Sequence, residues 1–143
     1  MPTSSANAAW EGGLRQGRGR FAAGSKAFEG EYSFATRFVE GTQGTNPEEL
    51  LAAAHAACFS MALSLILEKA GTPPTRVSTT ARCSIEPAGE GFKITKMRLE
   101  TRGEVPGVDQ ATFAKAADAA KEGCPVSGAL KGNVQLELDA RLA

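Results

Sequence analysis

The chain is poor in histidine, cysteine and aromatic residues. Its 143 residues include one His and three Cys, and aromatic side chains make up only 6%. Aliphatic side chains must therefore form most of the core. One His and three scattered Cys also argue against a zinc site, which needs about four ligands. The formal net charge is zero, with 16 basic and 16 acidic residues, so the charge balance indicates neither nucleic acid nor a charged membrane as a partner.

Three further features bear on the cellular compartment. No stretch reaches the roughly 18 consecutive apolar residues that a membrane-spanning helix needs. The segment MPTSSANAAW lacks the charged region and apolar run of a secretory signal. An odd number of cysteines argues against a secreted fold held by disulfides. We therefore expect a cytoplasmic protein with no membrane partner.

The length predicts a single domain over residues 1–143. Short strands are expected in its Gly-rich first part, at 8–12, 18–23 and 31–36. A long helix is predicted at 47–70, with Asn46 as its N-cap, Pro47 at its first position and Gly71 at its end. The middle of this helix is apolar nearly all round, which predicts a central and buried helix.

The second half of the chain predicts a hairpin followed by helices and a last strand. The hairpin strands are expected at 75–86 and 91–104, with a change of apolar phase in the second strand that indicates a bulge. Helices are then expected at 110–122 and 125–131, and a half-buried strand at 133–141. Because helices and hairpins are segregated along the chain, the predicted class is α+β with a mainly antiparallel sheet.

The three cysteines lie in different settings. Cys58 lies inside the apolar run HAACFSMAL, Cys124 precedes a proline at the start of a helical turn, and Cys83 is in phase with the buried face of a strand. Backbone N–H groups at a helix start stabilise a thiolate, which predicts Cys124 as the more acidic thiol. The pair Cys58 and Cys124 is the arrangement expected of one thiol that reacts and another that resolves the product as a disulfide. A small buried hydrophobe is the alternative for Cys58, and a core residue is expected for Cys83.

His55 lies one helical turn before Cys58. We interpret it as a packed or interfacial histidine. The alternative is a thiol hydrolase that uses Cys58 and His55, but the sequence offers no third group to orient the ring. From spacing alone, Glu48 is a first-turn acid that interacts with the helix dipole, and Arg37 is a surface cation.

Three segments together resemble a known family: YSFATRF, GTNPEELLAAAHAACFSMALSLIL and GCPVSGAL. In order and separation they closely resemble the osmotically inducible protein C (OsmC) family, relatives of the organic hydroperoxide resistance (Ohr) proteins. The HAACFSMAL segment is closer to the OsmC branch. The resemblance covers nearly the whole chain. It implies an OsmC-like α+β fold with mainly antiparallel sheets around two central helices, in an intertwined homodimer whose active sites lie at the subunit interface.

The resemblance also implies a thiol-dependent peroxidase that reduces organic hydroperoxides and, more weakly, hydrogen peroxide. By match to the family motifs, Cys58 would be the peroxidatic cysteine and Cys124 the resolving cysteine. Arg37 would stabilise the Cys58 thiolate, and Glu48 would hold that arginine in place. No bound cofactor or metal is expected, because an external dithiol would be the reductant. Cys83 lies outside the family pattern.

Two hypotheses accompany this reading of the chain. Leu51, Phe59 and Leu63 would wall an apolar pocket beside Cys58 that suits alkyl hydroperoxides. The alternative function is a redox-responsive switch or binding protein that uses the same cysteine pair without turnover. Arg37 with Glu48 separates the two functions, because a passive switch needs no cation to activate a thiolate.

Overall fold

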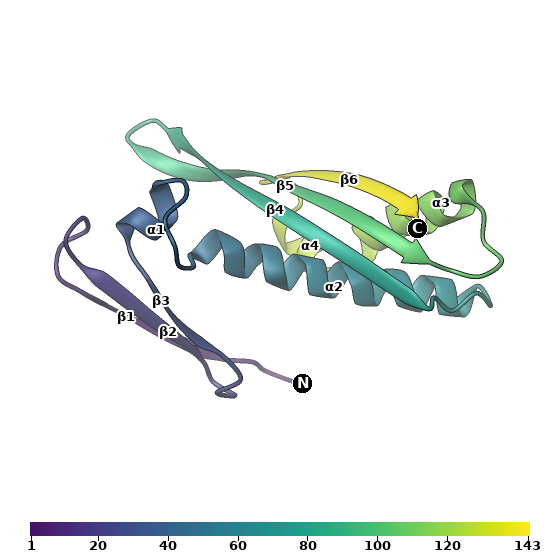
Figure 1. Cartoon of the computed structure of the whole chain (residues 1–143), viewed down its shortest axis with the longest axis horizontal. Helices are drawn as coiled ribbons and strands as arrows, with labels where there is room; N and C mark the ends of the chain where they lie inside the picture. The colour runs from purple at the N-terminus through teal and green to yellow at the C-terminus, as the bar shows by residue number, and fades with distance from the viewer. The chain divides into compact units, whose positions relative to one another are not determined.

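The computed structural model describes all 143 residues of the chain (Figure 1). The chain forms two compact units, Met1–Leu50 and Leu51–Ala143. The first unit contains a three-stranded sheet, and the second contains another three-stranded sheet with helices packed on it.

The first unit is an antiparallel sheet in the order β1-β2-β3, followed by a short helix. Its strands are β1 Ala6–Glu11, β2 Arg18–Ala23 and β3 Glu29–Tyr32. The predicted third strand ran too far, because α1, Phe34–Phe38, begins where that strand was expected to continue. Ser33 accepts a hydrogen bond from the Thr36 N–H at 3.2 Å, and the Ser33 N–H donates to the Thr36 hydroxyl at 2.8 Å. This reciprocal capping box starts a helix and ends the strand.

The long helix α2 spans Pro47–Lys69, which confirms the predicted helix and its ends. The Asn46 side chain accepts a hydrogen bond from the Glu49 N–H at 2.8 Å, as expected of an N-cap. At the other end Gly71 has φ 83°, the left-handed conformation that commonly terminates a helix.

One side of α2 is buried and another is exposed. His55, Phe59, Leu63 and Leu67 recur every fourth residue and are at most 1% exposed, whereas Met61 is 76% exposed. The predicted burial all round is therefore wrong within the second unit, whose sheet and other helices cover only one side of α2. By length and composition α2 also meets the requirements for crossing a membrane, which corrects the expectation that no such stretch exists. Core helices of globular proteins meet the same requirements, so this finding assigns no membrane role.

The second sheet has the order β4-β5-β6, with β4 Arg76–Ala88, β5 Gly91–Glu104 and β6 Gln135–Leu142. Strands β4 and β5 are antiparallel, but β5 and β6 are parallel. The prediction of a mainly antiparallel sheet is confirmed, with this one parallel pair as an addition. The parallel pairing follows from the helices between β5 and β6, which carry the chain back to the starting edge before β6 begins.

The predicted bulge in the hairpin is confirmed by a shift of register between Ser84 and Ile85. The turn is shorter than predicted, because Ala88 pairs directly with Gly91. Gly89 in this turn has φ 59°, a conformation that few other residues adopt without strain.

The remaining helices are α3, Gln110–Gly123, and α4, Pro125–Leu130, close to their predicted bounds. Asp109 caps α3 by accepting from the Thr112 N–H at 2.8 Å. The two helices join α2 in one core against the sheet. Its buried members are Phe59, Leu63, Leu67, Leu99, Val105, Phe113, Ala117, Ala120 and Cys124.

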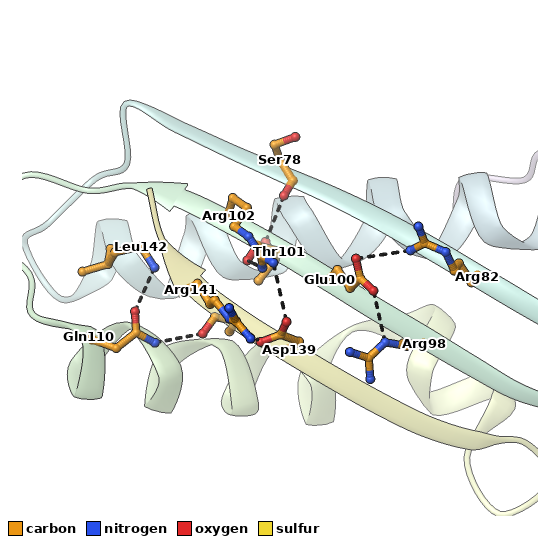
Figure 2. Close-up of polar contacts among 11 residues, drawn as sticks. Ser78, Arg82, Arg98, Glu100, Thr101, Arg102, Gln110, Asp139, Arg141 and Leu142 are labelled. Carbon is orange, nitrogen blue, oxygen red and sulfur yellow. Dashed lines mark hydrogen bonds and ion pairs between the residues drawn. The ribbon is translucent and has the colours of Figure 1, made fainter.

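The opposite face of this sheet carries charged side chains (Figure 2). Glu100 contacts Arg82 at 3.2 Å and Arg98 at 3.1 Å. Asp139 forms a similar group with Arg102 of the neighbouring strand β5 and Arg141 of its own strand β6. Such solvent-exposed pairs contribute little to stability, because water screens their charges. Their position shows that the sheet buries only the face that contacts the helices, and the thiol site lies on that side.

Candidate thiol site

The structure brings Cys58 and Cys124 together. Cys58 lies on α2 and is half-buried, and it packs against the core cluster that contains Cys124. Cys124 is 1% exposed and lies between α3 and α4. The two thiols are hydrogen-bonded to each other, and both are free rather than joined in a disulfide. This contact places the two sulfurs close together, as a reversible disulfide requires.

The start of α4 directs hydrogen-bond donors at the two sulfurs. Burial alone would raise the pKa of Cys124. Four hydrogen bonds outweigh this effect of burial and hold the pKa of Cys124 below its ordinary value. Their donors are the Cys58 thiol, the Ser127 N–H, the Ser127 hydroxyl and the Val126 N–H. These N–H groups are available because the first turn of a helix has no internal partner for them. These directions agree with the prediction that Cys124 is the more acidic thiol.

The pKa of Cys58 is shifted in the opposite direction, above its ordinary value. Burial raises the pKa of Cys58, and the hydrogen bond that it shares with Cys124 raises it further. The Val126 N–H partly offsets this rise. Within this pair, Cys124 is therefore the thiol that ionises more readily, and Cys58 donates its proton toward it. Cys58 needs an additional positive group if it is to react as a thiolate at neutral pH.

Arg37 and Glu48 form a second pair, within the first unit. The Arg37 Nε contacts both carboxylate oxygens of Glu48, at 3.0 and 3.2 Å, and Nη2 contacts Oε1 at 2.7 Å. Glu48 is 4% exposed, so the carboxylate is held almost out of solvent. The fork geometry fixes the orientation of the guanidinium group more firmly than a single contact would.

His55 is fully buried, which confirms the interpretation of a packed histidine. Its Nε2 lies 2.7 Å from the hydroxyl oxygen of Ser127, and its Nδ1 has no hydrogen-bond partner. Burial lowers the pKa of His55, so the ring is neutral near pH 7. The ring therefore interacts with a hydroxyl group, not with the Cys58 sulfur that the hydrolase alternative would require.

Sequence reasoning missed Ser127. Its spacing of three residues from Cys124, across a predicted helical turn, was the one available signal that the two side chains share a face. Its contact with His55 joins α4 to α2, and no local pattern encodes that contact. Ser127 is 2% exposed, so its hydroxyl group is held inside the core.

Two other expectations need correction. Phe59 and Leu63 are fully buried in the core cluster, so they cannot wall a pocket that is open to substrate. Cys83 on β4 is half-buried and is not a member of the buried core. No group of three or more His, Cys, Asp or Glu side chains is arranged to hold a metal ion.

Comparisons with known proteins identify the family. A family model described as OsmC-like protein matches residues 40–139. The chain belongs to this family. It is 50% identical over 129 residues to Peroxiredoxin OsmC of Escherichia coli K12, covering 90% of each chain. It is 35% identical over 122 residues to an organic hydroperoxide resistance protein of Xanthomonas axonopodis pv. citri, covering 84% of each. These identities confirm the predicted place in the OsmC branch.

Solved structures of the family share the fold. An organic hydroperoxide resistance protein OsmC from Legionella pneumophila matches with a TM-score of 0.81 and 27% identity, over 99% of this chain and 98% of that one. OhrB of Bacillus subtilis matches with a TM-score of 0.76 and 27% identity, over 96% and 98%. The predicted OsmC-like α+β fold is confirmed.

Proposed function

We propose that the protein is a cysteine-based peroxidase that reduces organic hydroperoxides and, more weakly, hydrogen peroxide. The observation that carries the proposal is the hydrogen-bonded pair of free thiols, Cys58 and Cys124. The family adds support, since relatives at 50% and 35% identity are named as a peroxiredoxin and an organic hydroperoxide resistance protein.

The chemistry takes place in three balanced steps. The Cys58 thiolate attacks the outer peroxide oxygen, so an S–O bond forms, the O–O bond breaks, and the alkoxide leaves and is protonated to an alcohol. The Cys124 thiolate then attacks the sulfur of the Cys58 sulfenic acid, so the S–S bond forms, the S–O bond breaks, and the departing hydroxide takes up a proton to become water. An external dithiol reduces the disulfide by exchange and returns both thiols. No resident cofactor or metal takes part.

Arg37 and Glu48 are proposed to supply the activation that Cys58 lacks. Burial and the bond with Cys124 raise the pKa of Cys58, so a nearby permanent cation would restore the thiolate. A guanidinium also donates to a leaving peroxide oxygen. The bidentate contact with Glu48 supports this role, because it fixes the guanidinium in one orientation.

The proposed assembly is a homodimer in which each chain contributes one OsmC-like domain over residues 1–143. Support comes from α2, whose exposed side is a stripe of apolar residues. Met61 and Leu65 on this stripe are 76% and 49% exposed, and a second copy would cover them. Met61→Glu should convert the dimer to monomer in analytical ultracentrifugation. A monomeric wild-type protein at micromolar concentration would contradict this assembly. A dithiol-dependent enzyme suits a reducing compartment, and we propose the cytoplasm.

A dithiol-dependent assay with cumene hydroperoxide tests the function. Wild-type protein should consume the peroxide and Cys58→Ser should not. Cys83→Ser is the matched control, since it removes a thiol outside the pair and should retain activity. No consumption by fully reduced wild-type protein would overturn the proposal.

The second candidate is a redox switch that uses the same pair without turnover. The raised pKa of Cys58 favours it, because a protonated thiol reacts slowly with peroxide. Arg37→Ala separates the two functions. It should abolish rapid peroxide consumption by a peroxidase, whereas slow disulfide formation in a passive switch should continue at an unchanged rate.

A further inference from the structure

A buried hydrogen bond between His55 and Ser127 lies beside the thiol pair. His55 and Cys58 lie three residues apart on α2, and Cys124 and Ser127 lie three residues apart at the start of α4. The two helices therefore meet at two neighbouring contacts, thiol to thiol and imidazole to hydroxyl. Ser127 takes part in both regions, because its hydroxyl also bonds the Cys124 sulfur.

The direction of these hydrogen bonds follows from the number of protons. The Ser127 hydroxyl has one proton, and its bond to Cys124 lowers the thiol pKa, so this proton is donated to the sulfur. The Ser127 oxygen must then accept from His55 Nε2, which carries the ring proton. Nδ1 is left as a bare acceptor, and it is the ring atom without a partner.

The unpaired Nδ1 of His55 indicates that this residue does more than fill space in the core. A buried polar atom without a partner destabilises a fold, and a leucine would fill the same space without one. The imidazole is therefore not the optimal residue for packing alone. What it adds over a leucine is the donor at Nε2, which contacts Ser127 at 2.7 Å.

We propose that His55 is a positioning residue for Cys124: it holds the Ser127 hydroxyl so that the hydroxyl proton points at the Cys124 sulfur and stabilises its thiolate. The inference rests on the proposed function only in assigning Cys124 the resolving step. In that step the thiolate of Cys124 attacks the sulfur of Cys58 sulfenic acid, the S–O bond breaks, and the departing hydroxide takes a proton to become water. His55 stays neutral throughout and transfers no proton.

The hydrogen bond from Ser127 to Cys124 also affects the reduction of the disulfide. A thiol with a low pKa is the better leaving group in thiol–disulfide exchange. A reductant that attacks the Cys58 sulfur therefore expels Cys124, whose thiolate is stabilised by Ser127. His55 and Ser127 thereby favour one of the two sulfurs as the point of attack.

The test measures the pKa of Cys124 directly, in protein that carries Cys58→Ser and Cys83→Ser and so has one thiol. The ultraviolet absorbance of the thiolate is followed against pH for this parent protein and for its variants. The variants are Ser127→Ala, His55→Leu, His55→Gln and the double variant that combines His55→Leu with Ser127→Ala. Ser127→Ala should lower the thiolate population at a fixed pH below the pKa by roughly ten-fold, as expected for loss of a hydrogen bond to a charged group. His55→Leu should lower it by a smaller factor.

Two comparisons distinguish positioning from packing. His55→Gln keeps an N–H donor near the Nε2 position and should retain the parent titration. The double variant should titrate like Ser127→Ala, because His55 acts through Ser127. If His55→Leu leaves the Cys124 titration unchanged, or shifts it equally when Ser127 is Ala, the proposal is wrong. His55→Met replaces the Leu variant if the latter does not fold.

The outcome does not depend on peroxidase activity, because the single-thiol protein has none. A positive titration result with an inactive wild-type enzyme would refute the proposed function and leave the positioning role intact. An active wild-type enzyme whose His55→Leu variant titrates like the parent would refute the positioning role alone.

Discussion

Mild acid should destabilise the fold through His55, the single histidine of the chain. Burial lowers the pKa of His55 from its ordinary value of 6.5, so the unfolded chain takes up this proton at a higher pH than the folded chain. The stability that depends on the neutral ring is present above pH 6.5 and is lost as the pH falls below it. The loss continues until the pH reaches the lowered pKa of the folded state.

The size of the effect is bounded by the linkage of one proton. If the ring stays neutral in the folded state, the free energy of unfolding falls by about 0.4 kcal/mol at a pH equal to the unfolded pKa. It falls by about 1.4 kcal/mol one pH unit lower, and the limiting slope is about 1.4 kcal/mol per unit. For a domain with a net stability of about 5–15 kcal/mol this loss is measurable.

The carboxylates of Glu100 and Asp139 affect the stability in a lower pH range than His55 does. A hydrogen bond from Arg98 lowers the pKa of Glu100, and one from Arg141 lowers the pKa of Asp139. Their contributions are present above ordinary values of 4.5 and 3.8 and are lost as the pH falls through the lower folded values. Between these values and neutrality, His55 is the group whose titration we expect to dominate.

Urea denaturation of wild type and His55→Gln measures this linkage. Both proteins are kept reduced, at one protein concentration and one ionic strength, between pH 7.5 and about pH 5. The wild-type stability should fall relative to the variant below the ordinary histidine pKa, with the slope given above. Parallel stability curves for the two proteins would refute the conclusion that the folded state holds His55 neutral.

Three further outcomes are expected. Cys124→Ser should complete the first peroxide turnover and then accumulate sulfinic or sulfonic acid at the peroxidatic cysteine, and mass spectrometry showing no such product after excess peroxide would contradict a resolving role. Arg37→Ala should slow peroxide reduction by roughly 10²–10³-fold in stopped-flow assays, and an unchanged rate would exclude the proposed cation. Gly103→Ala should lose about 1–3 kcal/mol in denaturation, because the new Cβ would clash with the ring of the buried Phe113. Gly128→Ala, with no atom within 4 Å of its Cβ, is the matched control and should not destabilise.

The elements that the sequence predicted well are those with local determinants. Asn46 and Asp109 accept the N–H of the third following residue, and Gly71 adopts the left-handed conformation. These interactions lie within a few residues of each helix end, so residue type and spacing suffice to place them. The strand predicted to reach residue 36 is too long for an equally local reason, because the capping box of Ser33 and Thr36 starts a helix there.

Burial was predicted poorly because it depends on surfaces beyond the element itself. The apolar composition of α2 indicated burial all round, yet Met61 is largely exposed in the single chain. A pattern shows which residues can be buried, not which surface covers them. The misplaced pocket has the same origin, since Phe59 turns toward the sheet and α3 rather than toward a substrate.

The candidate site combines both kinds of information. The acidity of Cys124 followed from its place before Pro125, at the start of a helical turn. Its pairing with Cys58 was predicted from the settings of the two cysteines and again from the family resemblance, and the structure shows the contact. Neither the sequence pattern nor the family resemblance predicted the hydrogen bond between His55 and Ser127, because it depends on how α4 lies against α2.

That packing also couples the hydrogen bond to the redox state of the pair. Reduced Cys124 offers a thiolate to the Ser127 hydroxyl, but a disulfide sulfur is neutral and a weak acceptor. The bond from Ser127, oriented by His55, therefore stabilises the reduced pair more than the oxidised pair. Any such preference shifts the equilibrium of thiol–disulfide exchange toward reduction. A disulfide formed at this site is accordingly one that an external dithiol can reopen, which is what repeated peroxide turnover requires and a stable structural disulfide would prevent.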